Sequence, residues 1–249
     1  MGTIYRREMG SFFTSGIGYV FLTVFYIASG YFFYNDVIKS GLGDISPMFV
    51  SMFIVVIFLI PVLTMRLLSE EKKNRTDQGL LTAPISLWEI VLGKFFAAFT
   101  LFVIAESVIF IYALILRYLS KDMVWSSLLG NYFAMLILGA AFIAIGVFIS
   151  SLTENQMASA VVSVFFFLVL YAFDDSALEK LNSNSFISKN LKISTREKIM
   201  EFLSHLSMRS RYTEFTRGIF SLSSVLFFLS IVFLFNFFTV KVLEKKRWA

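Results

Sequence analysis

The sequence predicts an all-α integral membrane protein with six transmembrane helices, and three observations lead to that prediction. Apolar residues make up 57% of the 249 residues, whereas charged residues make up only 16%. Mean hydropathy is +0.77, above the value that a soluble domain of this length would have. Six runs with little or no charge also approach or exceed the roughly 20 residues that a helix needs to cross a bilayer.

The predicted spans follow one another along a single domain that covers residues 1–249. They are residues 12–34, 45–65, 95–116, 123–152, 157–173 and 219–240. An even number of spans places both termini on one side of the membrane. Basic residues concentrate on the cytoplasmic side of membrane proteins, and both ends of this chain are basic: Arg6 and Arg7 near the start, and Lys241, Lys245, Lys246 and Arg247 near the end. We therefore expect both termini in the cytoplasm.

The segment 66–94, between the second and third spans, carries nine charged residues. A solvated tether would explain the charge alone, but the segment is longer than a helical hairpin needs. Thr76 before the sequence DQGLL predicts a short capped helix, and Pro84 before ISLWEI permits one helix to stop and another to begin. We therefore predict a short cytoplasmic helix that docks on a partner.

The segment 174–218, between the fifth and sixth spans, predicts a second helix outside the membrane. Ser194 and Glu197 have the spacing of a capping box, and apolar residues follow on one helical face: Ile199, Phe202, Leu203 and Leu206. This pattern predicts an amphipathic helix on the outer face. It either covers the mouth of the bundle or takes part in gating or in receiving substrate.

Glu106 is the acidic residue nearest the middle of a predicted span. It lies twelve residues after Lys94 and eleven before Arg117, so a helix places it about 18 Å and about 16 Å from those charges. A carboxyl group at mid-bilayer depth usually has a partner or a function. Glu106 either joins two helices by a hydrogen bond or lines the substrate path, and we treat it as a candidate pathway residue.

Several kinds of chemistry do not fit the residues available. The chain has no Cys and a single histidine, His205, so no Cys-rich or His-rich metal site is expected. The phosphate-binding motif G-x-x-x-x-G-K-[ST] does not occur, because Phe95 follows Gly93 and Lys94, and Trp88 stands where the first glycine would be. We expect no catalytic residues and no ATP hydrolysis by this chain, and we attribute its net charge of +5 to membrane topology rather than to nucleic-acid binding.

Several segments of the sequence resemble the ABC-2 type transporter permeases, the membrane subunits of bacterial ATP-driven exporters. The similar segments are TMRLLSEEK, LLTAPIS, LWEIVLGKF, RREMGSFFTSGIGYVF near the N-terminus, SSLTENQMASAV, and the C-terminal FFTVKVLEKKRW. Within this family, the sequence resembles the gliding-motility permease of the GldF type. The chain departs from the family where Gly-Thr-x-Glu is common, because it has Arg75, Thr76, Asp77 and Gln78 there.

The resemblance implies how the protein is built and driven. It implies an amphipathic N-terminal helix ahead of the first span, and a coupling helix in segment 66–94 that sits in a groove of a separate ATPase. The residues that it assigns to this contact are Glu70, Glu71, Arg75, Thr76, Asp77, Leu80, Leu81 and Pro84. It further implies two ATPase subunits that hold ATP and Mg, no cofactor in this chain, a second identical or related permease, and a bacterial inner membrane location.

Two other functions fit the sequence less well. The sequence EEKKNR fits the E-E-x-x-x-R pattern and resembles CAAX-type intramembrane proteases, but those enzymes need histidines on other helices, and His205 lies outside the spans. An ion-coupled secondary transporter would need several midplane acidic residues or an inverted repeat, and only Glu106 qualifies. Neither the cargo nor the choice between homodimer and heterodimer follows from the sequence.

Overall fold

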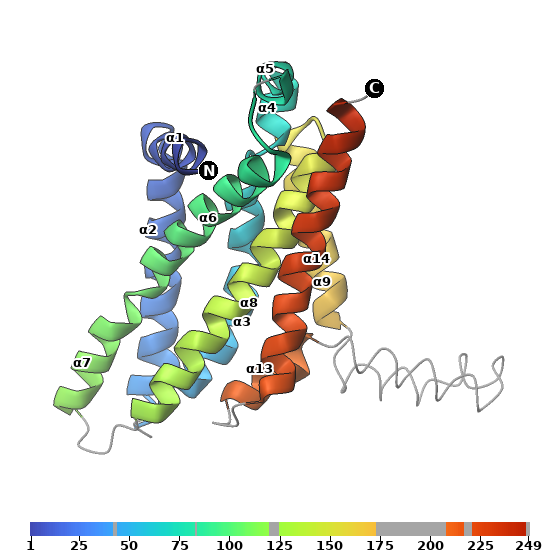
Figure 1. Cartoon of the computed structure of the whole chain (residues 1–249). Coiled ribbons are helices and arrows are strands. Elements are labelled where there is room, and N and C mark those ends of the chain that lie inside the picture. The colour runs from blue at the N-terminus through green and yellow to red at the C-terminus, as the bar shows by residue number, and fades with distance from the viewer. Residues whose placement is uncertain (42–43, 83, 120–124, 173–207, 217–220, 248–249) are drawn as a thin grey trace, which may run out of the picture.

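The computed structural model describes residues 1–41, 44–82, 84–119, 125–172, 208–216 and 221–247, and every regular element in these ranges is a helix. Figure 1 shows the long helices side by side as one bundle, with both termini at the same end as the short helices α4 and α5. In chain order the elements are α1 (Gly2–Thr14), α2 (Ile17–Phe32), the π-helix η1 (Phe33–Ile38), α3 (Ser46–Thr64), α4 (Ser69–Lys73), α5 (Asp77–Thr82), α6 (Leu87–Glu106), α7 (Ile109–Leu119), α8 (Trp125–Leu152), α9 (Gln156–Ala172), α13 (Met208–Thr216) and α14 (Leu222–Arg247).

A sharp turn separates α1 from the first long helix. Gly16 adopts a left-handed conformation with φ of 76°, which glycine reaches without the steric cost of a Cβ atom. The chain therefore changes direction at residues 15–16, and α1 lies across the end of α2 (Figure 1). The sequence predicted that the first span begins at residue 12, whereas Phe12 lies in α1 and the long helix begins at Ile17.

The third long segment is two helices, α6 and α7, separated by a break at residues 107–108. α6 begins at Leu87 because the Ser86 hydroxyl caps it, accepting a hydrogen bond from the Glu89 backbone N–H at 3.2 Å. The sequence predicted that this span begins at residue 95, because the charged residue Lys94 precedes it. In the structure the helix continues through Lys94.

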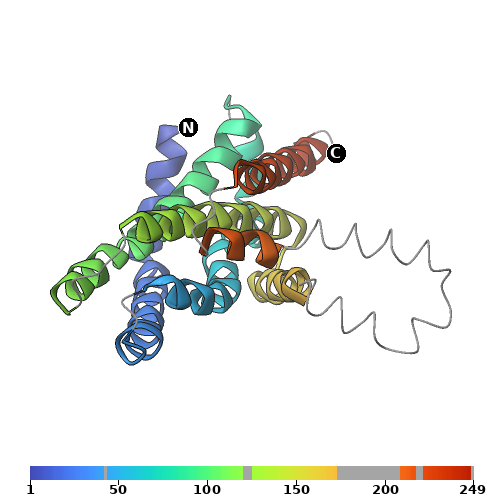
Figure 2. The same ribbon diagram turned by 90° about the horizontal axis from the view of Figure 1, so that it is seen from below.

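α8 is the central helix of the bundle. In its most apolar stretch of 18 residues, 78% is buried, against 22% for the corresponding stretch of α14. Figure 2 shows α8 running between the other helices. Two glycines permit this close packing. A Cβ atom on Gly139 would lie 2.2 Å from the Phe102 ring of α6, and one on Gly146 would lie 2.2 Å from the Thr64 hydroxyl of α3, so any larger residue would push these helices apart.

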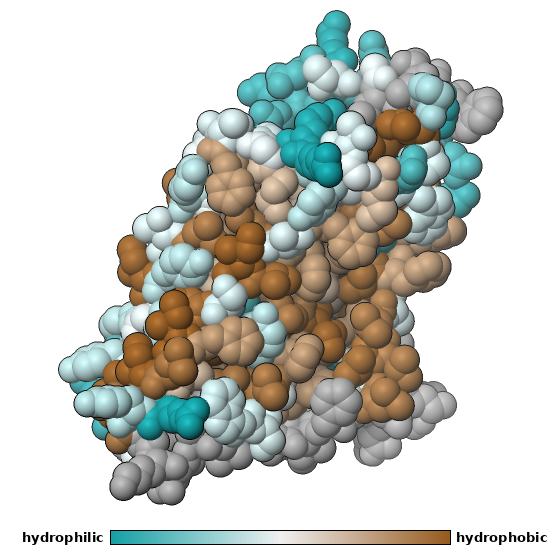
Figure 3. Space-filling model, turned by 60° about the vertical axis from the view of Figure 1, so that its left-hand side comes forward, coloured by the Kyte–Doolittle hydropathy of each residue, from teal (hydrophilic) through white to brown (hydrophobic). Residues whose placement is uncertain are grey.

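In the part of the chain that the structure describes, five helical segments are long and apolar enough to cross a membrane: Ile17–Ile38, Ser46–Lys73, Leu87–Leu119, Trp125–Leu152 and Leu222–Arg247. Figure 3 shows the matching surface, an apolar belt below a hydrophilic end that carries the short helices. The chain is therefore a multi-pass membrane protein. The fifth predicted span, residues 157–173, corresponds to α9, an apolar helix of 17 residues, which is short for a crossing and leaves that span a prediction.

The predicted amphipathic helix on the outer face, which includes Ser194 and His205, lies outside the described residues. The helix that follows it in the chain, α13, packs inward at the end opposite α4 and α5 (Figure 1). Tyr212 of α13 is only 1% exposed and donates a hydrogen bond to the Phe49 carbonyl of α3 at 3.0 Å.

Candidate functional site

Three parts of the chain meet at the end of the bundle that carries the short helices: α1, the first half of α6, and the turn from α3 into α4. Charged side chains from all three parts form a group of ion pairs, which we call the junction cluster: Arg7, Glu8, Arg66, Glu70, Glu71 and Lys94. It has three positive and three negative side chains. Its members lie within the described residues, and its charges balance.

Lys94 is the centre of the junction cluster. It is 0% exposed, and its ammonium group lies 2.9 Å from Glu8 Oε1 and 2.9 Å from Glu71 Oε1. The same group donates a hydrogen bond to the Leu67 carbonyl at 2.6 Å. An ammonium group has three N–H donors, so these three partners use its full capacity and compensate for its removal from water.

Arg7 and Glu8 bring α1 into this contact. Arg7 donates hydrogen bonds to Glu8 at 2.6 Å and to Glu71. Burial by itself would raise the pKa of Glu8, but Lys94 and Arg7 lower it below its ordinary value. Burial by itself would lower the pKa of Arg7, but the hydrogen bond to Glu8 and the nearby Glu71 raise it. Both groups therefore stay charged at neutral pH.

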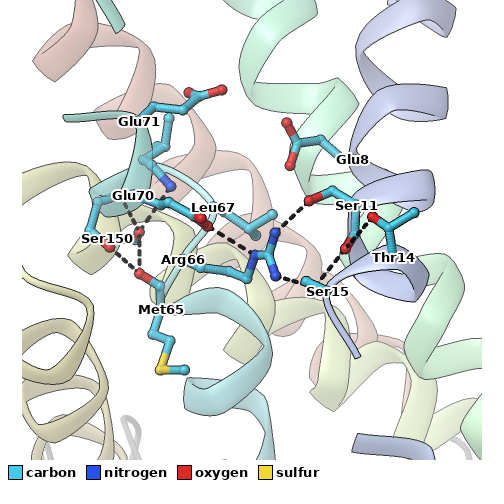
Figure 4. Close-up of polar contacts among 12 residues, drawn as sticks. Glu8, Ser11, Thr14, Ser15, Met65, Arg66, Leu67, Glu70, Glu71 and Ser150 are labelled. Atoms are coloured by element: carbon cyan, nitrogen blue, oxygen red, sulfur yellow. Dashed lines mark hydrogen bonds and ion pairs between the residues drawn. The ribbon is translucent and has the colours of Figure 1, made fainter. Parts of the chain in front are cut away.

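Arg66 joins the end of α3 to the end of α1. Its Nε lies 3.2 Å from Glu70, and its other two nitrogens donate hydrogen bonds to the hydroxyls of Ser11 and Ser15 (Figure 4). The guanidinium group also lies over the Phe12 ring, 5.9 Å from its centroid. The side chain is only 8% exposed, so the turn after α3 cannot move away from α1 without breaking these contacts.

Ser150 fixes the other side of the same turn to α8. Its hydroxyl accepts hydrogen bonds from the backbone N–H groups of Leu68 and Ser69, both at 3.1 Å, and donates one to the Met65 carbonyl at 3.1 Å (Figure 4). Lys72 of α4 also donates to the Ser151 carbonyl near the end of α8. The short helix α4 is thus attached to α1, α6 and α8 at once.

The segment beyond α4 faces outward. Arg75, Thr76 and Pro84 are exposed and Asp77 is half-buried. Arg75 has a φ of 56°, a left-handed conformation that only a few per cent of non-glycine residues adopt. α5 begins at Asp77, directly after the Thr76 that the sequence marked as its cap, and ends before Pro84. Leu80 and Leu81 lie in α5, but their side chains lie outside the described residues.

The structure thus divides the residues that the sequence assigned to ATPase coupling. Glu70 and Glu71 belong to the junction cluster and bind other parts of this chain, whereas Arg75, Thr76 and Asp77 lie on the outward segment. The sequence did not single out Glu8. The available signal was its position four residues from both Ile4 and Phe12, which places a carboxylate on the apolar face of α1; all three are buried.

Glu106 lies far from this cluster, at the last residue of α6 before the break into α7. It is 2% exposed, so it faces the interior of the bundle rather than lipid. The position fits either reading of this residue, an interhelical contact or a lining of a path.

A cavity of about 290 Å³ opens beside the junction cluster. Its lining combines charged cluster members with polar groups of α1 and of the turn after α4: Arg7, Glu8, Ser11, Arg66, Leu67, Glu70, Glu71, Asn74 and Thr76. Within the described residues, no group of three or more His, Cys, Asp or Glu side chains could hold a metal ion. The arrangement connects structural elements and presents polar groups for binding.

Comparison with known proteins gives one result that covers most of the chain. A search among curated proteins finds no match. A family model described as ABC-2 family transporter protein matches residues 3–242, a range that contains all members of the junction cluster and most of each long apolar segment. The chain belongs to the ABC-2 transporter family.

Proposed function

We propose that this chain is the permease subunit of an ATP-driven exporter in a bacterial inner membrane, with both termini in the cytoplasm. The family match supports an ABC transporter permease, a membrane subunit that works with a separate ABC ATPase. In this proposal the ATPase hydrolyses ATP with Mg, and two permeases and two ATPases form the complex. The second permease is either a second copy of this chain or a related one.

The observation that carries the coupling part of the proposal is the attachment of α4. The outward segment of residues 75–84 is the surface offered to the ATPase. It continues directly into α4, which the junction cluster and Ser150 join to α1, α6 and α8. Because Lys94 and Arg66 are buried and each binds groups on more than one element, a push on the outward segment reaches several long helices together.

The experiment is purification of the complex from native membranes, with the partners identified by mass spectrometry. We expect an ATPase that carries a phosphate-binding loop to co-purify with the chain. Leu80→Pro should abolish this association, because proline inside α5 removes a backbone hydrogen bond and clashes with the preceding turn. Asp77→Lys should weaken it by reversing a charge at the contact.

Lys39→Glu is the matched control, because it also reverses an exposed charge but lies just beyond η1, at the opposite end of the bundle. It should keep the ATPase. Transport into inverted vesicles with ATP then tests the export direction. Retention of full ATPase binding and transport by Leu80→Pro would contradict the proposed docking surface, and transport that needs an ion gradient but no ATPase would favour a secondary transporter.

A further inference from the structure

The cavity beside the junction cluster lies at the depth of lipid headgroups. α3 has 19 residues, so its length is about 28 Å, close to the ~30 Å thickness of the hydrocarbon core. α3 ends at Thr64, and the cavity is lined by Arg66, Leu67 and Glu70 directly after it. With α3 across the core, these residues lie in the headgroup layer on the side that carries α4 and α5.

The charges around the cavity match a group with both signs. Glu70 and Glu71 provide carboxylates, and Arg7, half exposed at its side chain, provides a guanidinium group. Ser11, Asn74 and Thr76 add hydroxyl and amide groups. The volume of about 290 Å³ falls at the lower end of the range for small-molecule sites, roughly 300–1,000 Å³. It suits a headgroup, with the lipid chains outside.

One residue of the lining, Glu71, has a carboxylate oxygen without a donor in the part of the chain that the structure describes. Glu71 Oε1 receives both Arg7 and Lys94, but Glu71 Oε2 is buried and accepts no hydrogen bond among the described residues. A buried acceptor without a donor is unfavourable, and the donor that best complements a carboxylate is a charged N–H group. The balanced cluster leaves no net charge to attract a simple anion.

We propose that this cavity binds the headgroup of a lipid that carries a phosphate and a primary ammonium group, as in phosphatidylethanolamine. The ammonium group donates to Glu71 and Glu70, and the phosphate accepts from Arg7 and from the hydroxyl and amide groups of the lining. The bound lipid reinforces the contact between α1 and α4. This inference does not depend on the ATPase or on the cargo.

The test compares lipids that differ only in the headgroup. The purified full chain in detergent is titrated with phosphatidylethanolamine, phosphatidylcholine or phosphatidylglycerol with identical acyl chains, and binding is followed by native mass spectrometry and thermal unfolding. Choline has no N–H, so phosphatidylethanolamine should bind about tenfold more tightly, since a hydrogen bond to a charged group is worth roughly one power of ten. A fourth arm with soluble phosphoethanolamine shows whether the headgroup suffices without chains.

Two variants address the site in different ways. Glu71→Gln removes the carboxylate charge, and Asn74→Leu fills the lining without removing an ion pair of the junction cluster. Both should abolish the preference for ethanolamine over choline, while Glu244→Gln, which removes an exposed carboxylate on α14, should keep it. Equal binding of the first two lipids overturns the proposal, as does a preference that survives in both site variants.

Discussion

The most direct test of the junction cluster is Lys94→Met, which keeps much of the side-chain volume and removes the charge. Both carboxylates lie 2.9 Å from the Lys94 nitrogen, so without it Glu8 and Glu71 face each other with only Arg7 between them. Removal of one partner of a buried ion pair costs about 3–5 kcal/mol. The carboxylate side chains are 11% and 15% exposed and Arg7 remains, so we expect about 2–3 kcal/mol.

The measurement is thermal unfolding of the purified chain in detergent, where this loss corresponds to a fall in Tm of roughly 4–12 °C. Glu8→Gln in the Lys94→Met background should restore part of the loss, because it removes a carboxylate that has lost its partner. Lys241→Met is the control, since its pair with Glu244 is exposed on both sides and such pairs contribute about 0–1 kcal/mol. An unchanged Tm in Lys94→Met, or additive effects in the double variant, would refute this account of the cluster.

Four further predictions follow from other positions. The pKa of Glu8 lies below its ordinary value of 4.5, so its stabilisation is complete above pH 4.5 and is lost as the pH falls below it; Tm measured from pH 3.5 to 7 should drop more steeply at the acid end for the parent chain than for Glu8→Gln. Gly146→Ala should destabilise by about 1–3 kcal/mol because the added Cβ atom meets α3 at 2.2 Å, whereas Gly130→Ala, with nothing within 4 Å, should not; denaturation of both variants checks this. Arg75→Gly should raise the stability of the outward segment by about 1 kcal/mol through relief of its left-handed backbone, seen as slower amide exchange there. Glu106→Gln should leave transport and ATPase activity of the reconstituted complex near normal if the residue is an interhelical contact; a sharp loss of transport with ATPase activity intact would place it on the substrate path.

The approximate positions of the five long apolar segments could be predicted from the sequence, because a bilayer imposes a length and a composition that each segment must meet by itself. The long helix α8 matches its predicted range closely, at Trp125–Leu152 against 123–152. The short helix α5 could also be predicted from local sequence, because Thr76 precedes it and Pro84 follows it. These features depend on neighbouring residues only.

The junction cluster was beyond the reach of the sequence for a physical reason. A count of hydropathy ends the span at Lys94, because burial of an unpaired charge costs much free energy. Its partner Glu8 lies 86 positions away in the chain, and the left-handed turn at Gly16 places α1 beside α6. The sequence by itself determined where the five long apolar segments and the short helix α5 lie along the chain. Only the tertiary structure decided which charges are buried, because burial becomes favourable only where the opposite charges converge.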